Sequence, residues 1–245
     1  MIVVLAIDAL EYEKVEEYNC IHLKQRCYGK TDISEFSQPR TMVLWSSFMT
    51  GENKEEEVLS KGDKEMWNIK WDIEETFFSS FSNPVILDLP GFNYDKEVHD
   101  RSRELLKRFF EEKSQGEKKK IRDEYNKLAF DHHRIIKEEF LNALEREHDF
   151  VLGYFSVADV IGHLNFGNNT MMKLIYRDLD EIAAKAADKT DKLIVLSDHG
   201  MEAIGEFGDH SNYGFWSTSW ESNLKKPRIT DFRDVILALK EADIC

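Results

Sequence analysis

Cysteine is scarce in this sequence, and so are proline and long apolar runs. The three cysteines, Cys20, Cys27 and Cys245, are sparse and odd in number, which argues against a disulfide framework and fits a reducing compartment. No stretch approaches the roughly 20 apolar residues of a membrane-spanning helix. The apolar segment 1–7 also lacks the basic leader and cleavage site of a signal peptide. We therefore expect a cytoplasmic protein with no membrane partner.

Positive charge is also in short supply. Lys and Arg number 33 against 47 Asp and Glu, which gives a formal net charge of −14. Phosphate backbones and anionic membranes require clustered Lys and Arg, so a nucleic acid polymer is not an expected partner. A small anionic substrate remains compatible with this charge if bound cations supply positive charge locally.

The chain length and the order of its segments predict the fold class. The 245 residues, with 4 prolines and 12 glycines that mark no linker, suit a single domain over 1–245. Short apolar runs alternate with amphipathic segments, which predicts an α/β fold with a mostly parallel central sheet and helices on both faces. The expected strands are 2–7, 20–23, 85–89, 150–156 and 193–196, and the expected helices are 42–50, 170–187 and 232–242.

Two segments carry further detail. The helix over 170–187 is expected to bury a face made of Leu174, Ile175, Leu179 and Ile182. Residues 97–148 are rich in charge, with apolar residues at helical spacing, and predict a helical insertion or cap made of two helices joined near Gly116.

Polar residues follow three predicted strands. Ligands of open α/β sheets bind beyond the carboxyl ends of the strands. Taken singly, each of these residues is explained by a helix cap, a turn or a surface pair. Taken together, three Asp and three His at one sheet edge suit two divalent metals with three protein ligands each, Zn first and Mn as a second choice. The six residues are Asp8, Asp159, His163, Asp198, His199 and, in a turn-rich loop, His210.

Thr41 is the candidate nucleophile. It stands at the start of the helix expected to end at Gly51, where backbone N–H groups favour an anion. Its hydroxyl needs a metal to ionise at neutral pH. A plain role as a helix N-cap is compatible with this function.

These motifs together resemble the alkaline phosphatase superfamily, in the branch of type I phosphodiesterases and nucleotide pyrophosphatases. They occur in the order known for that branch and span most of the chain. The matching pieces are Ala6-Ile7-Asp8, Thr41 to Thr50-Gly51, Asp159-x-x-Gly162-His163, Leu196-Ser197-Asp198-His199-Gly200-Met201 and Gly208-Asp209-His210.

The resemblance implies a role for each matched residue. One metal would be held by Asp8, Thr41, Asp198 and His199, and the other by Asp159, His163 and His210. Thr41 would attack phosphorus and form a phospho-threonine intermediate that water hydrolyses. Two divalent cations against three carboxylates and an ionised threonine leave such a site close to neutral, so it would accept an anionic phosphate.

The substrate pocket departs from the pattern of that branch. Leu44 stands where an asparagine often follows the nucleophile, and a charged run beginning at Glu52 replaces a proline and a His-Gly. Arg40, Trp45 and Tyr213 are candidate substrate contacts, although core packing is the stronger interpretation for the aromatic residues and Arg40 could equally face solvent. The Asp131-His132-His133 cluster has no identifiable partner in the sequence and is interpreted as surface or lid.

The expected function is hydrolysis of phosphodiester or pyrophosphate bonds in a small phosphorylated substrate, with nucleotides among the candidates. A phosphomonoesterase of the same superfamily is the alternative enzyme, and a metal-stabilised binding module with little turnover is the non-catalytic alternative. A phosphoglycerate mutase would need a second large domain, and a sulfatase would need a Cys-x-Pro-x-Arg setting, neither of which the sequence contains. The oligomeric state is left open.

Overall fold

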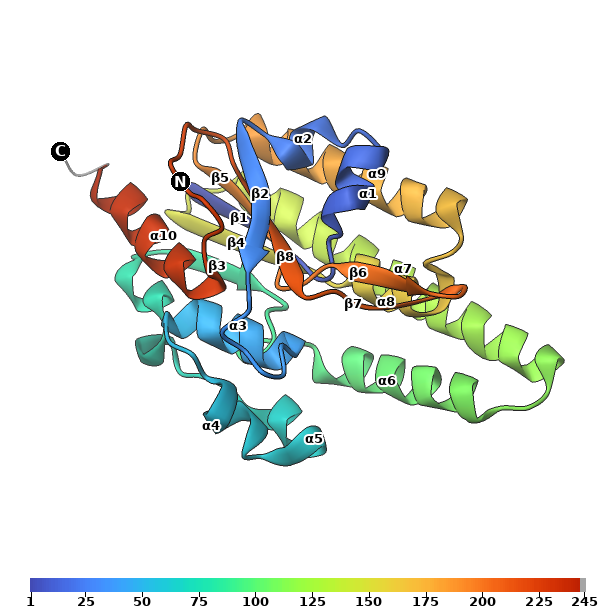
Figure 1. The fold of residues 1–245 in the computed structure, drawn as a ribbon. Helices are drawn as coiled ribbons and strands as arrows, with labels where there is room; N and C mark the ends of the chain where they lie inside the picture. The colour runs from blue at the N-terminus through green and yellow to red at the C-terminus, as the bar shows by residue number, and fades with distance from the viewer. Residues whose placement is uncertain (243–245) are drawn as a thin grey trace.

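The computed structural model describes residues 1–242, so Cys245 lies outside the described residues. Its centre is a six-stranded sheet in the order β2-β8-β5-β1-β4-β3. The pairs β1–β4, β1–β5 and β3–β4 are parallel, while β8 runs antiparallel to both β5 and β2. The predicted α/β class with a mostly parallel sheet is confirmed (Figure 1). The strands are β1 (Ile2–Ile7), β2 (Cys27–Asp32), β3 (Pro84–Leu87), β4 (Phe150–Phe155), β5 (Leu193–Leu196) and β8 (Tyr213–Thr218).

Strand β1 is apolar throughout because both of its faces are buried. Side chains of a strand alternate between faces, so Val3, Leu5 and Ile7 enter one hydrophobic core. Ile2, Val4 and Ala6 enter a second core on the opposite face. The continuous apolar run therefore marks a central strand of a sheet covered on both sides.

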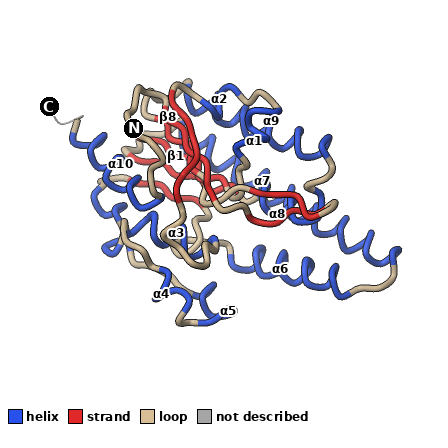
Figure 2. The backbone as a smooth tube through the Cα atoms, in the orientation of Figure 1, coloured by secondary structure: helices blue, strands red, loops and turns tan. Residues whose placement is uncertain are grey.

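Helices cover the two faces unequally, as the ribbon and the tube both show (Figures 1 and 2). One core contains residues of α1 (Tyr12–Glu17), α2 (Ile21–Lys24), α7 (Gln115–Leu144), α8 (Val157–Asn165) and α9 (Asn169–Ala187). The other core contains residues of α3 (Thr41–Thr50), α4 (Glu55–Leu59) and α10 (Phe232–Glu241). The short helix α5 (Gly62–Glu65) and the 3-10 turn η1 (Met66–Asn68) follow α4.

The predicted helical insertion consists of α6 (Lys96–Glu111) and α7, joined by residues 112–114 close to the expected position at Gly116. The last part of α7 packs on the sheet through Ile136, Phe140 and Leu144. Its first part and α6 extend beyond the sheet as a hairpin (Figure 1). Within residues 1–242 no helix combines the length and apolarity needed to cross a membrane.

Some predicted elements were wrong or missing. Residues 20–23 do not form a strand, because α2 begins at Ile21 and the strand is β2. β2 is a half-exposed edge strand with the sequence CYGKTD, so it gives no apolar signal. His210, expected in a turn-rich loop over 208–214, instead ends β7 (Phe207–His210), which pairs with β6 (Met201–Ile204) as an antiparallel hairpin. Leu174 is 62% exposed and does not belong to the buried face of α9.

Cys20 is buried and Cys27 is partly buried, and neither forms a disulfide within residues 1–242.

Candidate active site

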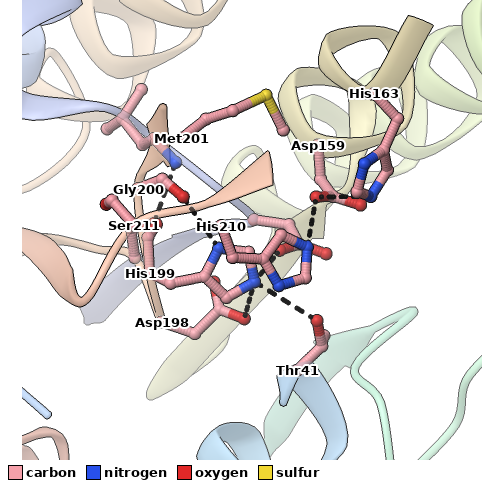
Figure 3. A network of polar contacts seen from close by, with 12 residues as sticks. Thr41, Asp159, His163, Asp198, His199, Gly200, Met201, His210 and Ser211 are labelled. Carbon is pink, nitrogen blue, oxygen red and sulfur yellow. Dashed lines mark hydrogen bonds and ion pairs between the residues drawn. The ribbon is translucent and has the colours of Figure 1, made fainter. Parts of the chain in front are cut away.

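The six predicted Asp and His residues and Thr41 lie together at the carboxyl ends of β1, β4 and β5. Figure 3 labels all of them except Asp8. Asp8 follows β1 directly, and its backbone N–H donates to the carbonyl of Phe155 at the end of β4, which aligns the ends of these strands. Asp159 and His163 are four residues apart on α8, which begins immediately after β4. Asp198 and His199 follow β5, and His210 ends β7.

Thr41 occupies the first turn of α3 with its side chain turned into the site. The N-cap of this helix is Arg40, and no side chain caps it. The alternative role of Thr41 as an N-cap is therefore wrong. Its Oγ1 lies 3.4 Å from Nε2 of His199. A buried threonine hydroxyl that does not cap its own helix is free to contact a ligand there.

The first group of candidate metal ligands is Asp8, Asp198 and His199, whose ligand atoms lie within 4.8 Å of one another. Nε2 of His199 lies 3.4 Å from Oδ1 of Asp8 and 3.4 Å from Oδ2 of Asp198. Tyr154 donates a hydrogen bond to Oδ2 of Asp8. Oδ1 of Asp8 and both carboxyl oxygens of Asp198 are buried without a hydrogen-bond partner in the described part of the chain.

The second group centres on Asp159. Its Oδ1 lies 3.3 Å from Nε2 of His163 and 3.3 Å from Nε2 of His210. A ligand atom of His199 also lies within 4.8 Å of those of Asp159 and His210. The rings of His199 and His210 stack at 3.8 Å, so the two groups share a border.

The tautomer of His199 points to a cation between these side chains. Its Nδ1 lies 3.0 Å from the carbonyl oxygen of Gly200, which can only accept, so Nδ1 carries the proton. Burial lowers the pKa of His199 to about 3, and the neutral ring then directs the Nε2 lone pair at two carboxylates. A neutral imidazole that donates Nδ1–H to a backbone carbonyl and presents Nε2 beside carboxyl oxygens has the arrangement of a metal-ligating histidine.

The carboxyl groups give the same indication. Burial, followed by the charge of Asp159, raises the pKa of Asp198 to about 8. Burial and the charges of Asp198 and Asp159 also raise the pKa of Asp8. Without a cation, the protein thus disfavours the charges that it brings together. Buried carboxylate oxygens and imidazole nitrogens without partners fit two divalent metals, and N and O donors suit zinc or manganese.

A cavity of about 210 Å³ opens onto these residues. Its lining includes the candidate metal ligands Asp8, Asp159, His163 and His210, together with Thr41. Another part of the lining comes from residues that the sequence did not single out, on the segment around η1, the loop before α6 and α6 itself. These are Trp67, Tyr94, His99, Ser102, Arg103 and Leu106.

A family model described as type I phosphodiesterase / nucleotide pyrophosphatase matches residues 59–217, which is more than half of the chain. The chain belongs to this family. The predicted resemblance is thereby confirmed. Asp8 and Thr41 precede the matched segment, so their place in the site rests on the geometry.

Two solved structures similar to this chain are both of the murine ectonucleotide pyrophosphatase / phosphodiesterase 5, one of them an inactive variant in complex with AMP. Each is 13% identical over 84% of this chain and 58% of the other, with a TM-score of 0.44. This chain thus corresponds to little more than half the length of those proteins. No curated protein matches it.

In this member of the family, the three predicted substrate contacts lie elsewhere. Trp45 is fully buried against Phe48 and Tyr154, so core packing explains it. Arg40 points outward and pairs with Asp63 at 2.5 Å. The hydroxyl of Tyr213 donates to Glu11 at 2.5 Å. None of the three lines the cavity, because strong local partners or the core already hold their side chains.

Glu11 is a site residue that the sequence did not reveal. Its Oε2 accepts from the backbone N–H of Met201 at 2.9 Å and from Oγ of Ser211 at 3.4 Å. A Cβ on Gly200 would lie only 2.3 Å from this oxygen, which explains a glycine there. The buried carboxylate thus joins the segment after His199 to the segment after His210. Only the long-range fold creates these contacts, so no local motif could indicate them.

We expect Glu11→Ala to weaken zinc binding by about 10- to 100-fold, because supporting hydrogen bonds typically have that effect on metal affinity. The measurement is zinc competition against a chromophoric chelator. Glu13→Ala is the matched control, since Glu13 is exposed and pairs with Lys30. Equal zinc affinity in the two variants would show that Glu11 does not position the ligands.

The expected surface position of His132 was wrong, because this residue is buried, and His133 is partly buried. Nε2 of His132 and Nε2 of His99 lie 2.7 Å and 2.9 Å from the same oxygen of Asp88. His133 pairs with Asp178 at 2.8 Å. His99 also stacks on Tyr94 at 3.9 Å and lines the cavity. Asp88 therefore links both helices of the insertion to the end of β3 and supports one wall of the cavity.

Asp88→Asn is expected to cost about 2 kcal/mol of stability at neutral pH. Burial alone raises the pKa of Asp88, but hydrogen bonds from His132 and His99 lower it to about 2. A carboxyl with a lowered folded pKa stabilises the protein above pH 4 and loses that contribution as the pH falls toward 2.

Thermal unfolding of both proteins between pH 7 and pH 2 measures this difference. The melting temperatures of the wild type and the variant should converge as the pH falls. Asp131→Asn, a change at a partly exposed aspartate that lies beside His132 and pairs with Lys127, is the control. A constant difference between the two melting temperatures down to pH 2 would contradict an ionised Asp88.

Proposed function

We propose that this protein hydrolyses phosphodiester or pyrophosphate bonds of small phosphorylated substrates, with nucleotides among the candidates, and that Thr41 is its nucleophile. The observation that carries the proposal is the setting of Thr41. Its hydroxyl is buried, leaves its own helix uncapped and faces His199 beside carboxylate oxygens that have no hydrogen-bond partner in residues 1–242.

The residues divide into two candidate metal sites. We assign Asp8, Thr41, Asp198 and His199 to one cation, and Asp159, His163 and His210 to the other. When bound, two divalent cations would lower the pKa of the threonine hydroxyl and of water and offset the negative charge of the phosphoryl oxygens. Zinc is the first choice and manganese the second, because the donors are imidazole and carboxylate.

The chain itself supplies the nucleophile and its orientation. Oγ1 of Thr41 gives up its proton and forms a bond to phosphorus while the bond from phosphorus to the leaving oxygen breaks, and the leaving oxygen takes up a proton. Water then attacks phosphorus, the bond from phosphorus to Oγ1 breaks, and a proton from the attacking water restores the hydroxyl of Thr41. The uncapped N-terminus of α3 directs backbone N–H groups toward the transferred phosphoryl group.

The ester preference is tested with metal-loaded protein and two chromogenic substrates. Bis-p-nitrophenyl phosphate should be cleaved faster than p-nitrophenyl phosphate. A preference for the monoester would replace the proposal with a phosphomonoesterase of the same superfamily. Two bound metals without turnover of either ester would instead support a metal-stabilised binding module.

A further inference from the structure

One face of α6 contributes to the lining of the cavity that Thr41 also lines. His99, Ser102, Arg103 and Leu106 all line the cavity, and positions 99, 102/103 and 106 are three or four residues apart, as on one face of a helix. Among the described residues that line it, Arg103 is the only Lys or Arg. The lining therefore combines the Asp and His residues of the candidate metal sites with one permanently charged cation from α6.

Arg103 is held in place on several sides. Its guanidinium lies over the ring of Trp67 at 4.0 Å and donates to the hydroxyl of Tyr94 at 3.3 Å. The rings of Trp67 and Tyr94 stack at 6.0 Å with an interplanar angle of 18°. Asp100 accepts from the other terminal nitrogen at 2.6 Å. These contacts hold the plane of the guanidinium in one orientation before a ligand binds, which favours recognition of an anion.

The guanidinium also has N–H groups that make no hydrogen bond within the described chain. It carries five N–H groups, and only the two bonds to Tyr94 and Asp100 occupy them within the described chain. Asp100 does not cancel its charge fully, because the same carboxylate also pairs with Lys96 at 2.5 Å. The three groups together have a net charge of +1.

We propose that Arg103 binds a second anionic group of the substrate, so that preferred substrates are compact phosphate esters with a carboxylate or further phosphate near the reacting phosphorus. This inference rests on the proposed function, which places the reacting phosphoryl group at Thr41. A cavity of about 210 Å³ lies below the roughly 300–1,000 Å³ typical of drug-sized ligands, which favours a compact group.

Binding of two phosphonates of matched shape tests the inference on the zinc-loaded protein. 3-Phosphonopropanoate ends in a carboxylate, and 3-methylbutylphosphonate has an uncharged isopropyl group of similar shape at the same position. Calorimetry should show that the carboxylate compound binds at least about tenfold more tightly, as expected for charge-assisted hydrogen bonds. Arg103→Met should reduce this ratio to near one, and Arg103→Lys should retain part of it. Propane-1,3-diphosphonate, measured alongside, tells a carboxylate preference from a phosphate preference.

Arg101→Met is the matched control, because Arg101 lies on the same helix, pairs with Glu104 and Glu124 and does not line the cavity. This variant should keep the wild-type ratio. Equal binding of the two phosphonates to the wild type, or an unchanged ratio in Arg103→Met, would overturn the inference while leaving the hydrolase intact. Failure of both phosphonates to bind, with no ester cleaved, would instead count against the proposed function itself.

Discussion

Thr41→Ala is expected to lower turnover of bis-p-nitrophenyl phosphate by three orders of magnitude or more (~10³-fold) while both metals stay bound, since removing a nucleophile has effects of that size. Thr41 belongs to the first turn of α3, and alanine suits a helix, so the fold should persist. The substitution removes only the oxygen that lies beside His199.

Two control measurements show whether the loss of turnover is due to the missing hydroxyl. Elemental analysis of the purified variant after reconstitution should find the wild-type metal content. Thr41→Ser, which keeps a hydroxyl at the same position, should retain a measurable part of the activity. Full activity in the alanine variant would exclude Thr41 as the nucleophile.

Asp198→Asn is expected to have opposite effects on the metal-free and the metal-loaded protein. Asp198 is fully buried beside Asp8, and neither of its carboxyl oxygens has a hydrogen-bond partner in the described residues. In the metal-free protein, burial and the charge of Asp159 raise the pKa of Asp198 to about 8, so folding at neutral pH must protonate a carboxyl that is ionised in the unfolded chain. The neutral amide avoids this cost, so the melting temperature should rise.

With zinc present, the same variant should be the less stable of the two. A ligand that binds only the folded state stabilises it by about 2.7 kcal/mol at a hundredfold excess over its Kd, and the variant loses most of this gain. Differential scanning calorimetry compares the wild type and the variant, each with chelator and with zinc. The turnover of the variant should also fall. A lower melting temperature of the variant in chelator, with an unchanged response to zinc, would show that Asp198 supports packing and does not hold a metal.

The half of the site that contains the candidate metal ligands could be predicted because the positions of these residues follow from sheet geometry. Asp8 and Asp198 follow apolar runs, and the carboxyl ends of adjacent parallel strands meet at one edge. Thr41 was found through its place at a helix start. In each case, a local pattern of apolar and polar residues determined where the side chain would lie.

The other half could not be predicted for the opposite reason. Arg103 and His99 belong to a charged segment that resembles a solvated helix, and only its docking over the sheet turns one face toward the cavity. Asp88 and Glu11 act through hydrogen bonds to residues 11 to 200 positions away. The aromatic candidates failed similarly, since burial of Trp45 depends on partners remote in sequence.

The α6–α7 hairpin has a further consequence for how this protein can diversify. Its Phe109 and Phe110 contact Phe207 of β7, but the candidate metal ligands all lie outside α6 and α7. The proposed reaction chemistry and the proposed recognition of the substrate are thus carried by separable stretches of polymer. Under this proposal, exchanging a few side chains on a single projecting helix would redirect the protein to new esters while the candidate metal sites stay untouched.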